Sequence, residues 1–105
     1  MFDDLAEKLH AVAVEKGFWD QDVDDIFVTK QLMMIVSEAV EVMEAVRKDK
    51  GEEEIAKEFA DIIIRTLDLY AGMVESGYTS ISLDKAFEEK AQFNLTRPEK
   101  HGVRF

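Results

Sequence analysis

The chain contains long stretches without a residue that would break a helix. Its 105 residues include one proline, Pro98, and five glycines, at positions 17, 51, 72, 77 and 102. Between these positions apolar residues recur every three or four places, which is the period of one face of an α-helix. This pattern predicts an all-α protein.

Four helices are expected, over residues 2–16, 28–48, 52–76 and 82–93. Ser82 is a candidate N-cap for the fourth helix, because its hydroxyl can accept a hydrogen bond from a free backbone amide. The chain is expected not to be helical past Thr96, since the residue before Pro98 avoids the α region. We therefore predict a single four-helix, bundle-like domain over residues 1–105, with a non-helical tail at 95–105.

Composition argues against several classes of protein. The formal net charge is −10, which disfavours binding to a nucleic acid polymer or to an anionic membrane surface, because both call for a basic face. Cysteine is absent, so neither a disulfide framework nor a zinc finger is expected. The first ten residues carry acids where a secretory signal needs cations, and no apolar run reaches membrane-spanning length. We expect a cytoplasmic protein.

Two acids, Glu38 and Glu41, interrupt an apolar run in the second expected helix, "IVSEAVEVMEAV" at 35–46. A wide apolar face opposite them is expected to form the core and consists of Leu32, Ile35, Val36, Ala39, Val40, Met43 and Val46. Met34 and Ala45 flank the acids, although a solvent-exposed face would more often carry Lys, Gln or Arg. The spacing alone also allows a plain, solvated acidic stripe.

The third expected helix is apolar over more than half of its circumference, which predicts burial on two sides. The remaining narrow strip is polar and consists of Glu54, Glu58, Asp61, Arg65 and Asp68. A simple explanation of this strip is a set of ion pairs one turn apart, such as Asp61 with Arg65. Glu58 and Asp61 also repeat the three-residue spacing of the two acids on the preceding helix.

The second and third helices are joined by a short turn, so an antiparallel hairpin is expected, on which the two acidic strips can face each other. Four carboxylates would then converge, those of Glu38, Glu41, Glu58 and Asp61. They would need a compensating cation, and ligands that are all oxygen favour Mg²⁺ or Mn²⁺. A di-iron site is disfavoured, because His10 and His101 lie outside these acid pairs.

Magnesium held by carboxylates usually binds phosphate, and a phosphate ligand also needs cations from the protein. The fourth helix and the tail offer Lys90, Asn94 and Arg97, of which the first two share one helical face. Trp19, in the expected loop at 17–27, could stack on a nucleobase. Simpler explanations stay open. Lys90 could form a surface ion pair and Asn94 could be a helix C-cap. Trp19 and His10 could serve ordinary packing.

Four segments carry a resemblance to a known family: "GFWD" (17–20), "SEAVE" (37–41), "EFADIIIR" (58–65) and "KAQFNLTRPEKHG" (90–102). In this order they resemble the MazG-like nucleoside triphosphate pyrophosphohydrolases of the all-α NTP pyrophosphatase superfamily. The likeness extends from about His10 to Gly102. Its central motif, E-x-x-E followed on the next helix by E-x-x-D, is matched by the four acids that are expected to converge.

The resemblance implies hydrolysis of a nucleoside or deoxynucleoside triphosphate between its α and β phosphates, giving a monophosphate and pyrophosphate. It implies Mg²⁺ as the cofactor, a homodimer or homotetramer, and sites built partly at subunit interfaces. The four acids would bind the metal and serve catalysis. The nucleotide would be contacted by Lys90, Asn94 and Arg97, with His10 and Trp19 bordering the base. Many relatives carry two close acids before the first E-x-x-E, whereas Ser37 holds one of those positions here, which leaves the general base unassigned.

Two other functions fit parts of the sequence. Phosphoribosyl-ATP pyrophosphohydrolases resemble the chain in size and in their acidic helices, although "GFWD" and "RPEKHG" fit the MazG-like group better. A non-catalytic helical interaction module would carry the same acids as a solvated face. Mg²⁺ binding and the products formed from triphosphates would separate these readings.

Overall fold

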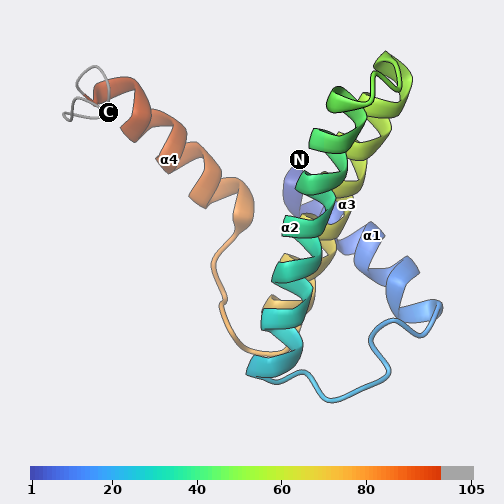
Figure 1. Ribbon diagram of the computed structural model, residues 1–105. Helices are drawn as coiled ribbons and strands as arrows, with labels where there is room; N and C mark the ends of the chain where they lie inside the picture. The colour runs from blue at the N-terminus through green and yellow to red at the C-terminus, as the bar shows by residue number, and fades with distance from the viewer. Residues whose placement is uncertain (98–105) are drawn as a thin grey trace.

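The computed structural model describes residues 1–97 and contains four α-helices in this range (Figure 1). They are α1 (Phe2–Glu15), α2 (Asp25–Arg47), α3 (Glu52–Glu75) and α4 (Leu83–Thr96). No strand occurs within residues 1–97, so the prediction of an all-α chain with four helices is confirmed. Among the described residues, no helix combines the length and the apolar character needed to cross a membrane.

The starts of α2 and α4 follow local capping signals. α2 begins at Asp25 rather than at residue 28, because the Asp24 carboxylate accepts a hydrogen bond from the Phe27 amide at 2.9 Å. The predicted loop is therefore shorter than expected. α4 starts after Ser82, as predicted, and the Ser82 hydroxyl accepts a hydrogen bond from the Lys85 amide at 3.1 Å.

The end of α4 lies later than the spacing of apolar residues predicted. The helix continues to Thr96 rather than to residue 93, so residues 95 and 96 of the predicted non-helical tail are helical, whereas the chain leaves the helix after Thr96 as expected. Arg97, which precedes Pro98, has an extended backbone with φ −75° and ψ 149°, as the steric demand of the proline ring requires. The rest of the predicted tail, and with it the end of the tail motif, lies outside the described residues.

α2 and α3 run antiparallel and side by side as a long hairpin (Figure 1). Gly51 lies in the turn between them with a φ of 97°, a left-handed conformation that residues with a Cβ atom rarely adopt. α1 crosses α3 and packs against it. α3 thus contacts both α1 and α2, but the predicted burial on two sides is only partial, because Phe59 and Ile63 of its apolar surface are 53% and 52% exposed.

α4 packs against α1 near the start of both helices and then extends away from the α2–α3 hairpin (Figure 1). The rings of Phe2 and Phe87 meet edge to face, with their centroids 4.9 Å apart. Large apolar side chains farther along α4 stay exposed, including Phe93 at 54% and Leu95 at 79%. The second half of α4 therefore has little cover within a single chain.

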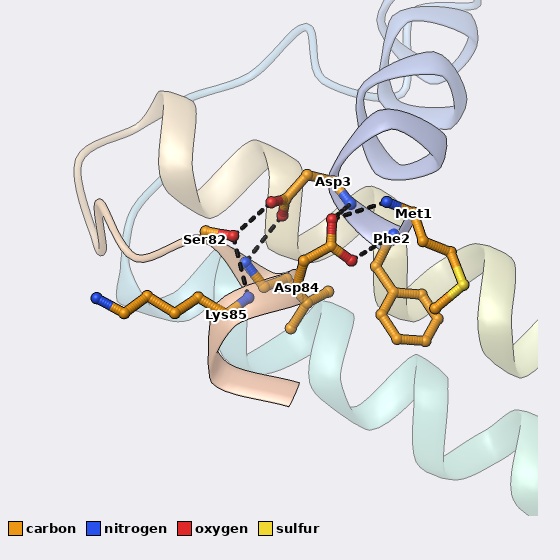
Figure 2. A network of polar contacts seen from close by, with 7 residues as sticks. Met1, Phe2, Asp3, Ser82, Asp84 and Lys85 are labelled. Atoms are coloured by element: carbon orange, nitrogen blue, oxygen red, sulfur yellow. Dashed lines mark hydrogen bonds and ion pairs between the residues drawn. The ribbon is translucent and has the colours of Figure 1, made fainter. Parts of the chain in front are cut away.

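A reciprocal set of hydrogen bonds joins the starts of α1 and α4 (Figure 2). The Asp84 carboxylate accepts hydrogen bonds from the backbone amides of Phe2 at 2.6 Å and Asp3 at 3.3 Å. In return, the Asp3 carboxylate accepts hydrogen bonds from the Ser82 hydroxyl at 2.6 Å and from the Leu83 amide at 2.8 Å. Each helix thus satisfies backbone donors that the other leaves free at its N-terminus.

The core is small. Its buried apolar side chains are Ala6, Ala13, Phe27, Val28, Ala45, Leu67 and Leu69. They come from α1, α2 and α3, and three of the seven are alanines. A core of this size gives a single chain only modest stability.

The face of α2 that packs against α3 is not the face that the sequence predicted. Ala45 is buried and Glu38 is half-buried, so α2 turns its mixed, acid-bearing side toward α3. The apolar face that was expected to form the core is about half exposed, with Leu32, Val36, Val40 and Met43 between 47% and 60%. The small Ala45 side chain permits close approach of the helices, and the Glu38 carboxylate finds a cation on α3.

Candidate functional site

Three carboxylates of the α2–α3 hairpin lie close together. One oxygen atom from each of Glu38, Glu58 and Asp61 falls within 4.8 Å of the other two. Glu38 comes from α2, whereas Glu58 and Asp61 come from α3, so the antiparallel packing of the helices creates the cluster. The spacing of the acids in the sequence predicted that four would converge, and three of the four do so, without Glu41.

The acids act on one another electrostatically. The pKa of Glu58 is raised above its ordinary value by partial desolvation, by a hydrogen bond with Glu54, and by the negative charges of Asp61 and Glu41. Mutual repulsion of this kind is what uncompensated neighbouring carboxylates produce. Glu41 is exposed and lies outside the tight group of three, but it is near enough to disfavour ionisation of Glu58.

Arg65 supplies a positive charge next to the cluster. Its Nε atom donates a hydrogen bond to Oε1 of Glu38 at 2.9 Å, and this ion pair links α3 to α2. The Glu38 side chain is only 15% exposed, so a partner for its charge is needed. The sequence suggested instead that Arg65 pairs with Asp61 on its own helix. Arg65 crosses to α2 because the less exposed carboxylate gains more from a cation.

A cleft of about 710 Å³ opens beside the acids. Residues of α1, α2, α3 and the loop that follows α1 form its walls. The polar and charged side chains along it include Trp19, Lys30, Gln31, Glu38, Asp61, Arg65 and Asp68. A volume of this size is typical of small-molecule sites, which span about 300 to 1,000 Å³. Acidic, basic and aromatic side chains therefore line the same cleft.

Trp19 forms part of the wall of this cleft. Its Nε1 atom donates a hydrogen bond to Asp68, at 3.0 Å from Oδ1 and 3.3 Å from Oδ2. The indole also contacts two other rings, with centroid distances of 4.6 Å to His10 and 5.1 Å to Phe27. Trp19 is thus fixed in the cleft wall, and the predicted contact of its indole with a nucleobase stays a prediction.

His10 lies behind Trp19 and is buried. Its Nδ1 atom is 2.8 Å from Oδ1 of Asp68, and its Nε2 atom is 2.9 Å from Oε2 of Glu75. Both ring nitrogens are therefore engaged by carboxylates of α3. His10 lines a second hollow, on another side of α1, together with Glu75. Its predicted place at the border of a nucleobase stays a prediction.

The three predicted phosphate- and nucleotide-contacting residues of the C-terminal region lie on or directly after α4. Lys90 and Arg97 flank the Phe93 ring, with Nζ 5.1 Å and Cζ 5.3 Å from its centroid. The side chain of Asn94 accepts a hydrogen bond from Nη1 of Arg97 at 3.4 Å. Because α4 extends away from the hairpin (Figure 1), a single chain does not bring these side chains to the acidic cluster.

The cleft also contains residues that the sequence did not single out as a site, namely Lys30, Gln31 and Asp68. Gln31 precedes Glu38 by seven residues, or about two helical turns, so the helical period already placed both on one face. Asp68 belonged to the polar strip of the third helix, but the spacing gave no sign of its two partners. The position of Lys30 depends on how α1 and the loop pack, which no local pattern encodes.

Comparison with protein-family models, curated proteins and solved structures found no significant match to this chain. Within the described residues, the acids that the structure brings together beside the cleft are Glu38, Glu58 and Asp61.

Proposed function

We propose that the chain is a Mg²⁺-dependent nucleoside triphosphate pyrophosphohydrolase that cleaves between the α and β phosphates. The observation that carries the proposal is the convergence of Glu38, Glu58 and Asp61 beside a cleft that also holds Arg65 and Trp19. One bound triphosphate could then contact three kinds of group. The acids would hold its metal ion, Arg65 would neutralise phosphate, and the Trp19 indole would contact the base. The resemblance to MazG-like enzymes assigns metal binding to the same acids.

The donor set fits a hard divalent cation. Carboxylate oxygens are the ligands that Mg²⁺ and Mn²⁺ favour. Besides desolvation and the hydrogen bond with Glu54, the charges of Asp61 and Glu41 raise the pKa of Glu58, and a cation among the acids would offset those charges. Glu38, Glu58 and Asp61 would hold the ion, with the nearby Glu41 as the fourth predicted ligand. When bound, Mg²⁺ neutralises phosphate charge and lowers the pKa of a coordinated water.

The protein's own groups would bind and orient the triphosphate. Lys30 and Arg65 neutralise phosphate oxygens in the cleft, and the Trp19 indole lies where a base can rest against it. Water attacks the α phosphorus, the bond to the bridging oxygen breaks, and pyrophosphate leaves with the bonding electrons. One carboxylate of the cluster accepts the proton of the attacking water.

We also propose that the active form is a homodimer or homotetramer. Apolar side chains on the outer faces of the described helices stay exposed, as they do in subunits that associate. The exposed apolar side chains of α2 include Val36 and Val40, and α3 exposes others, among them Phe59 and Ile63. A second copy that covers these side chains would also allow α4 of one chain to supply Lys90, Asn94 and Arg97 to the acids of another.

The test is to incubate the protein with a panel of ribo- and deoxyribonucleoside triphosphates and Mg²⁺ in ¹⁸O-labelled water, and to identify the products by chromatography and mass spectrometry. The proposal expects pyrophosphate together with a monophosphate that carries the label. Diphosphate with labelled orthophosphate would contradict it, because water would then have attacked the terminal phosphorus.

Variants of the cluster sharpen this test. Glu58→Gln and Asp61→Asn should abolish turnover while the helical circular dichroism spectrum is retained. Glu44→Gln is the matched control on α2, since Glu44 pairs with Arg47 and Lys48 of the same helical end. Full activity in the two cluster variants would overturn the assignment.

The same assay separates the other two functions that fit the sequence. Hydrolysis of phosphoribosyl-ATP without hydrolysis of ordinary triphosphates would indicate the sister activity. Absence of both activities, with no saturable heat of Mg²⁺ binding in calorimetry, would indicate a non-catalytic module whose acids form a solvated face.

A further inference from the structure

The indole of Trp19 is fixed by a chain of polar contacts that runs behind the cleft. Oδ1 of Asp68 lies 3.0 Å from Nε1 of Trp19 and 2.8 Å from Nδ1 of His10, so a single carboxylate oxygen serves both rings. The two rings meet edge to face at 4.6 Å. The orientation of Trp19 thus depends on an acid of α3 and on a histidine of α1.

His10 is held at its other end as well. Its Nε2 atom is 2.9 Å from Oε2 of Glu75, which lies seven residues, or about two helical turns, farther along α3 than Asp68. Each ring nitrogen of His10 is therefore within hydrogen-bonding distance of a carboxylate oxygen. The His10 side chain is 10% exposed and Asp68 is 23% exposed, so water competes little for the contact between them. The contact with His10 therefore holds the Asp68 carboxylate in one orientation next to the indole.

The other side of the indole rests directly on backbone. Gly72 lies one turn after Asp68 on α3, and a Cβ atom placed there would overlap the Cη2 atom of Trp19. Gly72 is buried in the last turn of α3, and glycine within a helix is less favourable than alanine. The need for room under the indole explains why this helix carries a glycine at that position.

We infer that Asp68 and His10 are positioning residues for Trp19, and that Gly72 provides the space that the positioned indole requires. Neither polar residue needs to touch the substrate, because both act by holding the aromatic wall of the cleft. Insofar as this inference concerns substrate, it rests on the proposed function: the network should set the affinity for the base-bearing end of the triphosphate and leave the chemical step nearly unchanged.

The first experiment needs no substrate. Trp19 is the only tryptophan of the chain, so intrinsic fluorescence reports on this side chain alone. Asp68→Leu, which removes both acceptor oxygens, should shift the emission to longer wavelength and increase quenching by acrylamide. Asp68→Asn keeps an acceptor for the indole and should restore most of the original spectrum. An unchanged spectrum in Asp68→Leu would overturn the inference.

Gly72→Ala tests the same geometry without removing a polar group. On helix propensity alone it should stabilise α3, whereas overlap with the indole should displace Trp19 and change its emission. Glu75→Gln is the control, because Glu75 is 73% exposed and reaches only the outer nitrogen of His10. A Gly72→Ala spectrum identical to that of the unaltered protein would contradict the placement of the indole on Gly72.

Kinetics then connect the network to substrate binding. Asp68→Leu and Gly72→Ala should each raise KM about fivefold or more, which corresponds to the lower end of the value of one aromatic stacking contact, while kcat changes by less than about twofold. A fall in kcat with unchanged KM would contradict a positioning role. If the unaltered protein hydrolyses no triphosphate, the proposed function fails, and the fluorescence results still decide whether Asp68 positions Trp19 against Gly72. His10→Leu, measured in the same way, should also shift the emission, and an unchanged spectrum would overturn the role of His10.

Discussion

Asp3 and Asp84 cap each other's helices. Asp84, in the first turn of α4, accepts hydrogen bonds from the first amides of α1, and Asp3, in the first turn of α1, accepts one from the Leu83 amide of α4 (Figure 2). An acid near a helix N-terminus is favoured by the helix dipole as well as by the free amides. This exchange joins two helices that share few apolar contacts, so the position of α4 depends strongly on two carboxylates.

The first prediction concerns the response of this junction to acid. The pKa of Asp84 is lowered from its ordinary value of 3.8, chiefly by its hydrogen bond with the Met1 amino group and then by that with the Phe2 amide. A lowered folded pKa means that Asp84 stabilises the fold above its unfolded pKa and that this contribution is lost as the pH falls through the folded pKa. Attachment of α4 should therefore weaken only in acid below the ordinary range of aspartate.

The Phe2 amide resonance in NMR spectra recorded across a pH titration measures this directly. Its chemical shift should follow the protonation of Asp84 with a midpoint below 3.8. Asp84→Asn should already show the acid-state shift at neutral pH and should lose the titration. A midpoint at or above the ordinary value would contradict the reciprocal capping.

The second prediction concerns Glu58. Because its pKa is raised above the ordinary value of 4.5, the ionised side chain destabilises the fold at neutral pH, and this penalty disappears as the pH falls through the raised pKa. Glu58→Gln should therefore raise the thermal unfolding midpoint at neutral pH in the absence of metal. Addition of Mg²⁺ should raise the midpoint of the unaltered protein, since ligands that bind the folded state stabilise it, and should leave Glu58→Gln unchanged. Equal responses of both proteins to Mg²⁺ would exclude Glu58 as a ligand.

The third prediction concerns the ion pair between α2 and α3. Arg65→Met leaves the half-buried carboxylate of Glu38 without its partner, which should lower the free energy of unfolding by about 1 to 3 kcal/mol. Arg47→Met is the control, because Arg47 pairs with Glu44 at an exposed helix end and should cost less than about 1 kcal/mol. Urea unfolding of metal-free protein measures both. A loss for Arg65→Met no larger than that of the control would show that the pair contributes little.

The helices and the acidic cluster were accessible from sequence for a physical reason. Helical periodicity and caps such as Ser82 act over a few residues, and the three-residue spacing of acids fixes where they lie on a helix. A short turn between two helices then leaves the hairpin as the simplest arrangement. The convergence of Glu38 with Glu58 and Asp61 needs nothing more than these local rules.

The sequence did not predict correctly which face of α2 packs against α3, nor the contacts of Trp19. An amphipathic pattern shows that the α2 face with Val36 and Val40 is apolar, but not whether it contacts the same chain or another molecule. The packing of Ala45 and Glu38 against α3 depends on a cation, Arg65, on a different helix. The Trp19–Asp68–His10 contacts likewise join residues from three separate segments, and their spacing in the sequence carries no period that would reveal them.

The fourth prediction follows from that exposed apolar face. We expect the unaltered protein to have a mass in solution that is a multiple of 12.0 kDa, because exposed apolar patches of this extent mark interfaces. Val36→Glu combined with Val40→Glu should give a monomer in size-exclusion chromatography with light scattering. Ile26→Glu, at an 81% exposed position of the same helix, should keep the original mass. A monomeric unaltered protein at micromolar concentration would contradict the interface, and α4 would then have no neighbour whose acids it could serve.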